Sequence, residues 1–108
     1  MTAWHDCTGF QRDLLKAIAD HDEYDREPYG LALRDWLEAK YDDEINHSRL
    51  YQNLAQLEDR GLVAKTSIDA RTNAYELTDT AEELVRHQAQ SFANVVGHDL
   101  LVTDGGDV

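Results

Sequence analysis

Residues 46–59 combine a leucine stripe with hydrogen-bonding side chains, as expected for a helix that packs on one side and binds a partner with the other. Leu50, Leu54 and Leu57 recur at helical spacing and define the buried side, and Asn46 is a good N-cap. The side chains able to contact a base edge or a phosphate are His47, Ser48, Arg49, Tyr51, Gln52, Asn53 and Gln56. Arginine can hold O6 and N7 of guanine, and glutamine or asparagine can hold N6 and N7 of adenine. We therefore expect this helix to bind double-stranded DNA in the major groove; the alternative is an ordinary solvated helix face.

A second group of hydrogen-bonding residues lies in a predicted β-hairpin, with strands over residues 62–67 and 73–77 and a polar turn between them. Lys65 and Arg71 bracket the hairpin, and Thr72 and Asn73 add neutral hydrogen-bonding groups. Such side chains suit contacts with phosphates or with the minor groove. The alternative is that these charges only keep an exposed hairpin soluble.

The first part of the chain must position both groups, and it is predicted to form two helices. Thr8 and Gln11 form a capping box that opens the first helix, and apolar residues at helical spacing follow. Residues 20–27 are predicted to form an acidic, non-periodic linker. Pro28 suits the first turn of a second helix, which is expected to end at an acidic turn over residues 42–44.

A last helix is predicted from Asp79 to about Gly97, capped by Thr78 or by Asp79 itself. At about 28 Å, it is longer than a small domain needs for its own core. Its apolar stripe would be an exposed patch on a monomer, which predicts a homodimer. The residues expected at the dimer interface are Trp4, Phe10, Leu84, Val85, Gln88, Phe92, Val95 and Val96. Residues 102–108 are expected to fray.

Acidic residues are unevenly distributed along the chain, which has a net charge of −12. Residues 45–75 hold four basic and three acidic residues, a net of +1, so the remainder carries −13. Acidic residues are thus few in the segment that is expected to contact DNA, which is a polyanion. We interpret the overall acidity as adaptation to a cytoplasm with molar salt, where charges are screened within about 3 Å. Potassium ions could then lie at the interfaces with DNA or between subunits. The rival interpretation is a protein that binds basic partners.

Several function classes lack support in the sequence. The single cysteine, Cys7, allows no intrachain disulfide and is interpreted as an inert thiol, with a redox sensor as the alternative. The five histidines are scattered without metal-ligand spacing, so no metal and no required cofactor are expected. There is no Gly-rich phosphate loop and no nucleophile elbow, which argues against an enzyme. We see neither a secretory signal nor an apolar span, which favours the cytoplasm.

Four segments of the chain resemble the PadR-like winged-helix regulators: residues 29–31, 45–54, 57–63 and 71–78. The similarity extends over about residues 8–96 and is greatest to short haloarchaeal members, which include a regulator of oxidative stress. It implies a dimer built through the first and last helices, a third helix in the major groove and a wing against the DNA backbone. The last helix carries no Trp, whereas some relatives hold a drug-like ligand with an aromatic residue there, so a small-molecule effector is not expected.

The sequence therefore predicts a mainly α fold with a two-stranded β-hairpin wing (α+β). This is a winged helix-turn-helix with a long C-terminal dimerisation helix. We expect one domain over residues 1–108, with the helix-turn-helix and wing over 8–77 and the dimerisation helix over 78–98. The predicted function is a sequence-specific, homodimeric DNA-binding transcription regulator of archaeal, halophilic type, with a role in stress response suggested by the resemblance. The alternative is a winged-helix module that binds protein or senses a ligand and does not bind DNA.

Overall fold

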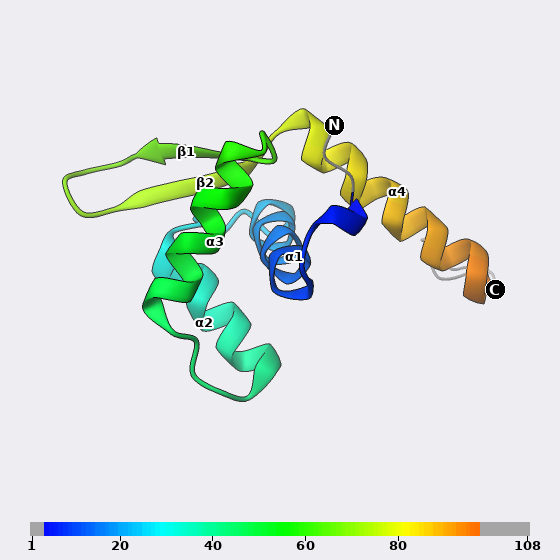
Figure 1. Ribbon diagram of the computed structural model, residues 1–108, viewed down its shortest axis with the longest axis horizontal. Coiled ribbons are helices and arrows are strands. Elements are labelled where there is room, and N and C mark those ends of the chain that lie inside the picture. Colours follow the sequence, from blue (N-terminus) through cyan, green and yellow to red (C-terminus); the bar gives the residue numbers. More distant parts are fainter. Residues whose placement is uncertain (1–3, 98–108) are drawn as a thin grey trace.

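The computed structural model describes residues 4–97, so the predicted fraying of residues 102–108 lies outside the described part (Figure 1). The elements follow one another as helix, helix, helix, hairpin, helix, which confirms the predicted winged helix-turn-helix. In chain order they are a 3-10 turn η1 (Trp4–Asp6), α1 (Gly9–Glu23), α2 (Gly30–Tyr41), α3 (His47–Asp59), β1 (Val63–Ser67), β2 (Asn73–Leu77) and α4 (Asp79–Val96).

Side-chain caps begin three of the helices, at positions that the sequence indicates. The Thr8 hydroxyl accepts from Gln11 N at 3.1 Å while the Gln11 side chain accepts from Thr8 N at 3.1 Å, so the capping box is complete. Asn46 caps α3 through Arg49 N at 3.0 Å, and Thr78 caps α4 through Ala81 N at 3.2 Å. Each cap satisfies an amide that the helix itself leaves unpaired.

The core lies where α1, α2 and α3 meet the base of the hairpin. Its fully buried side chains are mostly leucines, which pack closely against one another. They include Leu14, Leu15, Ile18, Leu33, Leu37, Leu50, Leu54, Leu57 and Leu62. From α4, Ala81 joins this core, Leu84 and Val85 pack partly against it, and Ala93 is buried further along the helix. The rest of α4 extends away from the other helices (Figure 1).

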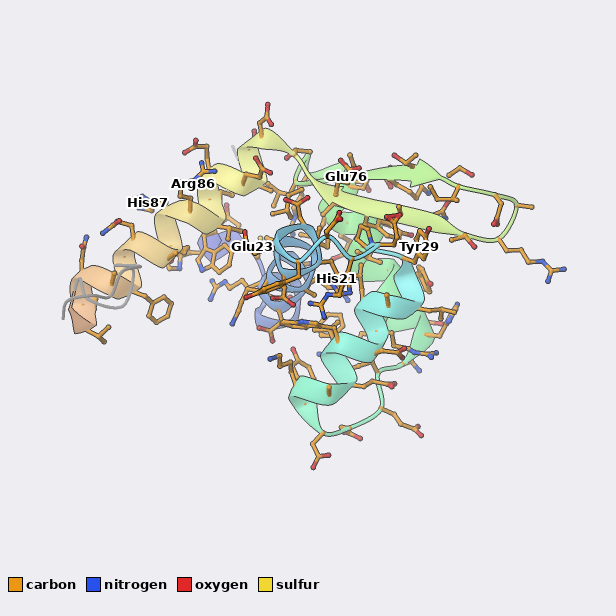
Figure 2. All side chains as sticks on the ribbon, turned by 180° about the vertical axis from the view of Figure 1, so that it is seen from behind. His21, Glu23, Tyr29, Glu76, Arg86 and His87 are labelled. Carbon is orange, nitrogen blue, oxygen red and sulfur yellow. The ribbon has the colours of Figure 1, made fainter. Side chains whose placement is uncertain are left out.

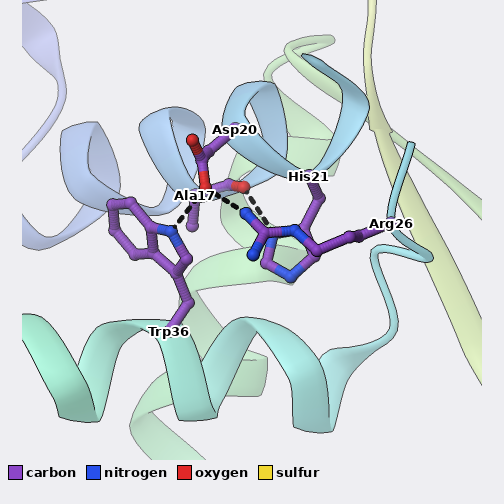
Figure 3. Close-up of polar contacts among 5 residues, drawn as sticks. All are labelled: Ala17, Asp20, His21, Arg26 and Trp36. Atoms are coloured by element: carbon purple, nitrogen blue, oxygen red, sulfur yellow. Dashed lines mark hydrogen bonds and ion pairs between the residues drawn. The ribbon is translucent and has the colours of Figure 1, made fainter. Parts of the chain in front are cut away.

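The predicted linker over residues 20–27 is wrong in its first half, because α1 continues to Glu23. His21 is 4% exposed and continues the apolar face of α1, with its Nδ1 2.8 Å from Ala17 O. Asp20 accepts a hydrogen bond from Trp36 Nε1 at 2.8 Å and pairs with Arg26, which ties the end of α1 to α2 (Figure 3). The pattern does not reveal this turn because histidine and aspartate are residue types that are usually exposed to solvent.

The hairpin is an antiparallel pair in which Val63 lies opposite Leu77 and Ser67 opposite Asn73. Its turn is closed by Ile68 N donating to Thr72 O at 2.8 Å, and by Arg71 N donating to the Asp69 carboxylate at 2.8 Å. The hydrogen bond from Arg71 N lowers the pKa of Asp69 below its usual value. A backbone hydrogen bond from Tyr75 N to Pro28 O joins the hairpin to the start of α2. The hairpin therefore extends sideways from a fixed base (Figure 1).

Candidate nucleic-acid interface

The outward face of α3 carries Ser48, Gln52 and Ala55, which recur at helical spacing opposite the buried leucines and are all exposed. Within residues 4–97, no hydrogen bond or ion pair occupies the side chains of Ser48 and Gln52. Both therefore keep their full hydrogen-bonding capacity for a partner. Ser48 lies in the first turn of α3 and Gln52 in the second, which is the end of a recognition helix that meets base edges.

One flank of α3 faces α1 and is held by hydrogen bonds. The Gln11 side chain donates to Asn53 Oδ1 at 3.0 Å and to Gln56 Oε1 at 2.8 Å. Arg60 Nη1 donates to Gln11 Oε1 at 3.1 Å. Asn53 also donates to Arg49 O at 2.8 Å. Asn53 and Gln56, both predicted DNA contacts, thus already have protein partners.

Arg49 lies on the same flank, with its guanidinium carbon 3.9 Å from the centre of the Phe10 ring. Phe10 is 6% exposed, and its ring meets that of Tyr41 edge-on at 6.2 Å. A guanidinium over an aromatic face is attracted by the ring quadrupole and keeps its N–H edge available. Arg49 thus joins α3 to α1, and Phe10 is a core residue with little surface left for a second subunit.

On the other flank of α3, the rings of His47 and Tyr51 lie 4.6 Å apart. Tyr51 packs across the start of α2 at Gly30, where a Cβ atom would stand 2.2 Å from the Tyr51 hydroxyl oxygen. Only glycine leaves room for this ring. The contact joins two segments singled out in the sequence, residues 29–31 and 45–54, and gives Tyr51 a role in packing as well. His47 remains exposed beside it.

The predicted wing residues differ in how free they are. Lys65 lies 4.0 Å from Glu58 at the end of α3, and both side chains are about half exposed. Arg71 is exposed in the turn, whereas Thr72 and Asn73 are half-buried. Arg71 is therefore the wing cation best placed to reach a phosphate beyond the protein surface.

Carboxylates lie both on the back of the molecule and beside α3. Glu23 and Glu76 lie on the face seen from behind in Figure 2, whereas α3 is in front in Figure 1. Three exposed acids, Asp42, Asp43 and Glu44, directly precede α3. Carboxylates therefore also lie close to the beginning of α3.

The exposed apolar side chains of α4 gather near its end. Phe92, Val95 and Val96 are 66%, 80% and 61% exposed, while Gln88 is half-buried. Trp4 is also half-buried, with the Arg12 guanidinium 5.6 Å from its ring centre. The free apolar face thus comprises the last turns of α4, and the predicted contacts nearer its start pack on the core of their own chain.

The described residues offer no other obvious chemistry. Residues 4–97 contain no group of three or more His, Cys, Asp or Glu side chains that could hold a metal. Cys7 is buried. In the same part of the chain, no helix has the length and hydropathy needed to cross a membrane.

Gln11 is the site residue that the sequence analysis treated only as a cap. Its signal was a polar side chain at helical spacing from Leu14 and Ile18, on the face that must be buried. A buried amide has to find partners, so this position called for hydrogen-bonding groups on a neighbouring helix.

An outward polar helix followed by an exposed hairpin, on a core of three helices, defines a winged helix-turn-helix DNA-binding protein. The chain belongs to the PadR-like family of transcriptional regulators, whose model matches residues 17–87. It is thus a DNA-binding transcription regulator and not an enzyme, which rejects the alternative of a module that does not bind DNA.

Among solved structures, the chain is similar to RosR of H. salinarum. The RosR-S1 complex has 37% identity and a TM-score of 0.76, over 83% of this chain and 76% of that one. RosR grown from NaBr has 37% identity and a TM-score of 0.75, over 82% and 76% of the two chains. No curated protein matches the chain.

Proposed function

We propose that the protein is a sequence-specific regulator that binds a pseudo-palindromic operator as a homodimer, with one α3 in each of two successive major grooves. The observation that carries this proposal is the outward face of α3, where Ser48 and Gln52 are exposed and unoccupied. One flank of the helix is held by Gln11 of α1, and the other packs through Tyr51 against Gly30 of α2. A rigidly held helix with free hydrogen-bonding side chains is what base readout needs.

In this proposal Asn53 and Gln56 are held by Gln11, and the remaining predicted DNA contacts act mainly on the DNA backbone. Arg49, resting on Phe10, can offer its free N–H edge to a phosphate or a guanine beside the first turn of α3. Arg71 and Lys65 reach phosphates from the wing, supported by Thr72 and Asn73. His47 and Tyr51 lie on the opposite flank of α3, where their polar atoms suit a neighbouring phosphate.

The homodimer is supported by the exposed end of α4. Phe92, Val95 and Val96 form an apolar patch that a second copy can cover by the same patch, as twofold symmetry requires. We propose that Leu84, Val85, Gln88 and Trp4 border this contact, whereas Phe10 is buried against Tyr41 and Arg49 and offers little surface to it. The chain then works as one winged-helix domain with a dimerisation helix.

We also propose a halophilic setting, supported by the net charge of −12 and the similarity to a protein of H. salinarum. Potassium ions between carboxylates and phosphates would fit this setting. Its place of work would be the cytoplasm, where the chromosome lies, and a role in stress response remains a proposal that rests on the resemblance.

Selection from random duplex DNA, followed by footprinting in molar KCl, tests the proposed function. We expect an enriched pseudo-palindrome whose half-sites are protected on one face of the DNA, about 34 Å apart. An enriched site without twofold symmetry, or no enrichment, would contradict it.

A further inference from the structure

The Gln11 side chain is 1% exposed, and all of its hydrogen-bonding capacity is used. A primary amide has two N–H donors and an oxygen with two lone pairs. Gln11 donates to Asn53 and Gln56, and its oxygen accepts from Thr8 N and Arg60. The amide thus belongs both to the cap of α1 and to the contact with α3.

Two bonds from one amide to successive turns of α3 do more than attach the helix. The leucine stripe of α3 fixes only its buried side, because apolar contacts have no direction. Rotating α3 about its axis, or sliding it by one residue, would separate Asn53 and Gln56 from Gln11 together. The buried amide would then be unpaired, which costs free energy.

We propose that Gln11 is a positioning residue for base readout: it sets the rotation of α3, so that Ser48 and Gln52 face the DNA while Asn53 and Gln56 are withdrawn from it. This inference rests on the proposed function of α3. The contact between Arg49 and Phe10 helps to fix the same rotation, since it joins the first turn of α3 to α1 on the same flank. A buried residue of α1 thus contributes to the base preference of α3.

The competing explanation is that Gln11 only stabilises the fold through its capping box. Two substitutions separate the two roles. Gln11→Glu keeps the side-chain length and can still accept from Thr8 N and Arg60, but it has no N–H to give to α3. Thr8→Ala removes the hydroxyl that accepts from Gln11 N and leaves the contacts between Gln11 and α3 in place.

The experiment measures the affinities of the full chain and its variants for the selected operator and for a scrambled duplex of the same length. The added charge of Gln11→Glu weakens both affinities equally, so the ratio of the two is the readout. We expect Gln11→Glu to lower this ratio about tenfold or more, the size of at least one lost base contact. Thr8→Ala should lower the midpoint of thermal unfolding and leave the ratio unchanged.

Repeating the selection with Gln11→Glu gives a second readout that loss of stability does not mimic. Base preferences should weaken at every position contacted by α3, whereas Gln52→Ala should lose the preference at one position. The proposal is overturned if Gln11→Glu keeps the wild-type ratio and preferences, or if it loses both affinities in proportion, as a destabilised protein would. If Gln52→Ala also keeps every base preference, the proposed function of α3 itself fails.

Discussion

At the scale of single residues, short-range roles follow from residue type, and long-range ones do not. Thr8 and Asn46 are predicted as caps from the sequence, and Thr78 as one of two candidates, because a cap acts within three residues of its own position. The partners of Gln11 lie 42 and 45 residues away, so nothing in the local pattern names them. The same holds for Tyr51 and Gly30, which meet only once the helices have packed.

The Tyr51 contact predicts that Gly30→Ala destabilises the protein. The new Cβ would stand 2.2 Å from the Tyr51 hydroxyl and 2.8 Å from two ring carbons, so the ring has to move. Overpacking of this kind costs about 1–3 kcal/mol in the free energy of unfolding. Urea unfolding checks the prediction, with Gly9→Ala as the matched control, since a Cβ there meets nothing within 4 Å. Equal stability of the two variants would contradict the account of Gly30.

At the scale of elements, the periodic pattern predicted the helices and the hairpin, but not every boundary. The segment after Asp20 was assigned to a linker because polar residues interrupt the apolar pattern. In the structure His21 is buried, and Asp20 accepts from Trp36, so α1 gains another turn. Tertiary partners extend the helix beyond the point where the hydrophobic pattern ends.

A second tie between α1 and α2, from the Tyr41 hydroxyl to Asp13, predicts an alkaline titration. Burial, and then the hydrogen bond to Asp13, raise the pKa of Tyr41 from 10.0 to about 12. The tie therefore contributes its full stability below pH 10 and loses it as the pH rises through about 12. Phenolate absorbance should show a last tyrosine step near that pH, absent from Tyr41→Phe. A Tyr41→Phe protein that retains this step would assign it to another tyrosine.

At the scale of the whole molecule, the sequence predicts that the apolar stripe of α4 is covered by a second subunit. It does not predict which of these side chains remain exposed once the chain has folded on itself. Phe92→Asp should convert the proposed dimer to a monomer, because it places a carboxylate in the apolar patch. Light scattering in high salt measures the mass. Gln90→Asp, exposed on another side of the same helix, adds the same charge and should remain dimeric. A wild-type monomer at micromolar concentration would disprove the dimer.

The acidity of the molecule predicts an unusual response of DNA affinity to KCl. Basic DNA-binding proteins release counterions when they bind. The logarithm of their affinity therefore falls with the logarithm of the salt concentration, with a slope of about −0.9 per phosphate neutralised. Asp42, Asp43 and Glu44 are exposed and shortly precede α3, so we expect cations to enter between these carboxylates and the DNA phosphates. The uptake of these cations then offsets the release of counterions, and we expect the affinity for DNA to change little or to rise with KCl concentration in the molar range. A steep loss of affinity would exclude cation uptake while leaving DNA binding intact.

The central claim is that α3 contacts base edges in the major groove and that the wing contacts the phosphate backbone of the DNA. The most direct test compares Gln52→Ala with Arg71→Ala on the selected operator and on a scrambled duplex at one KCl concentration. Gln52→Ala should weaken operator binding by about 1–3 kcal/mol and leave scrambled DNA unaffected, since one base contact is lost. Arg71→Ala should weaken both duplexes alike, as the loss of a phosphate contact does. Wild-type operator preference in Gln52→Ala, or no preference in the wild type, would contradict the claim.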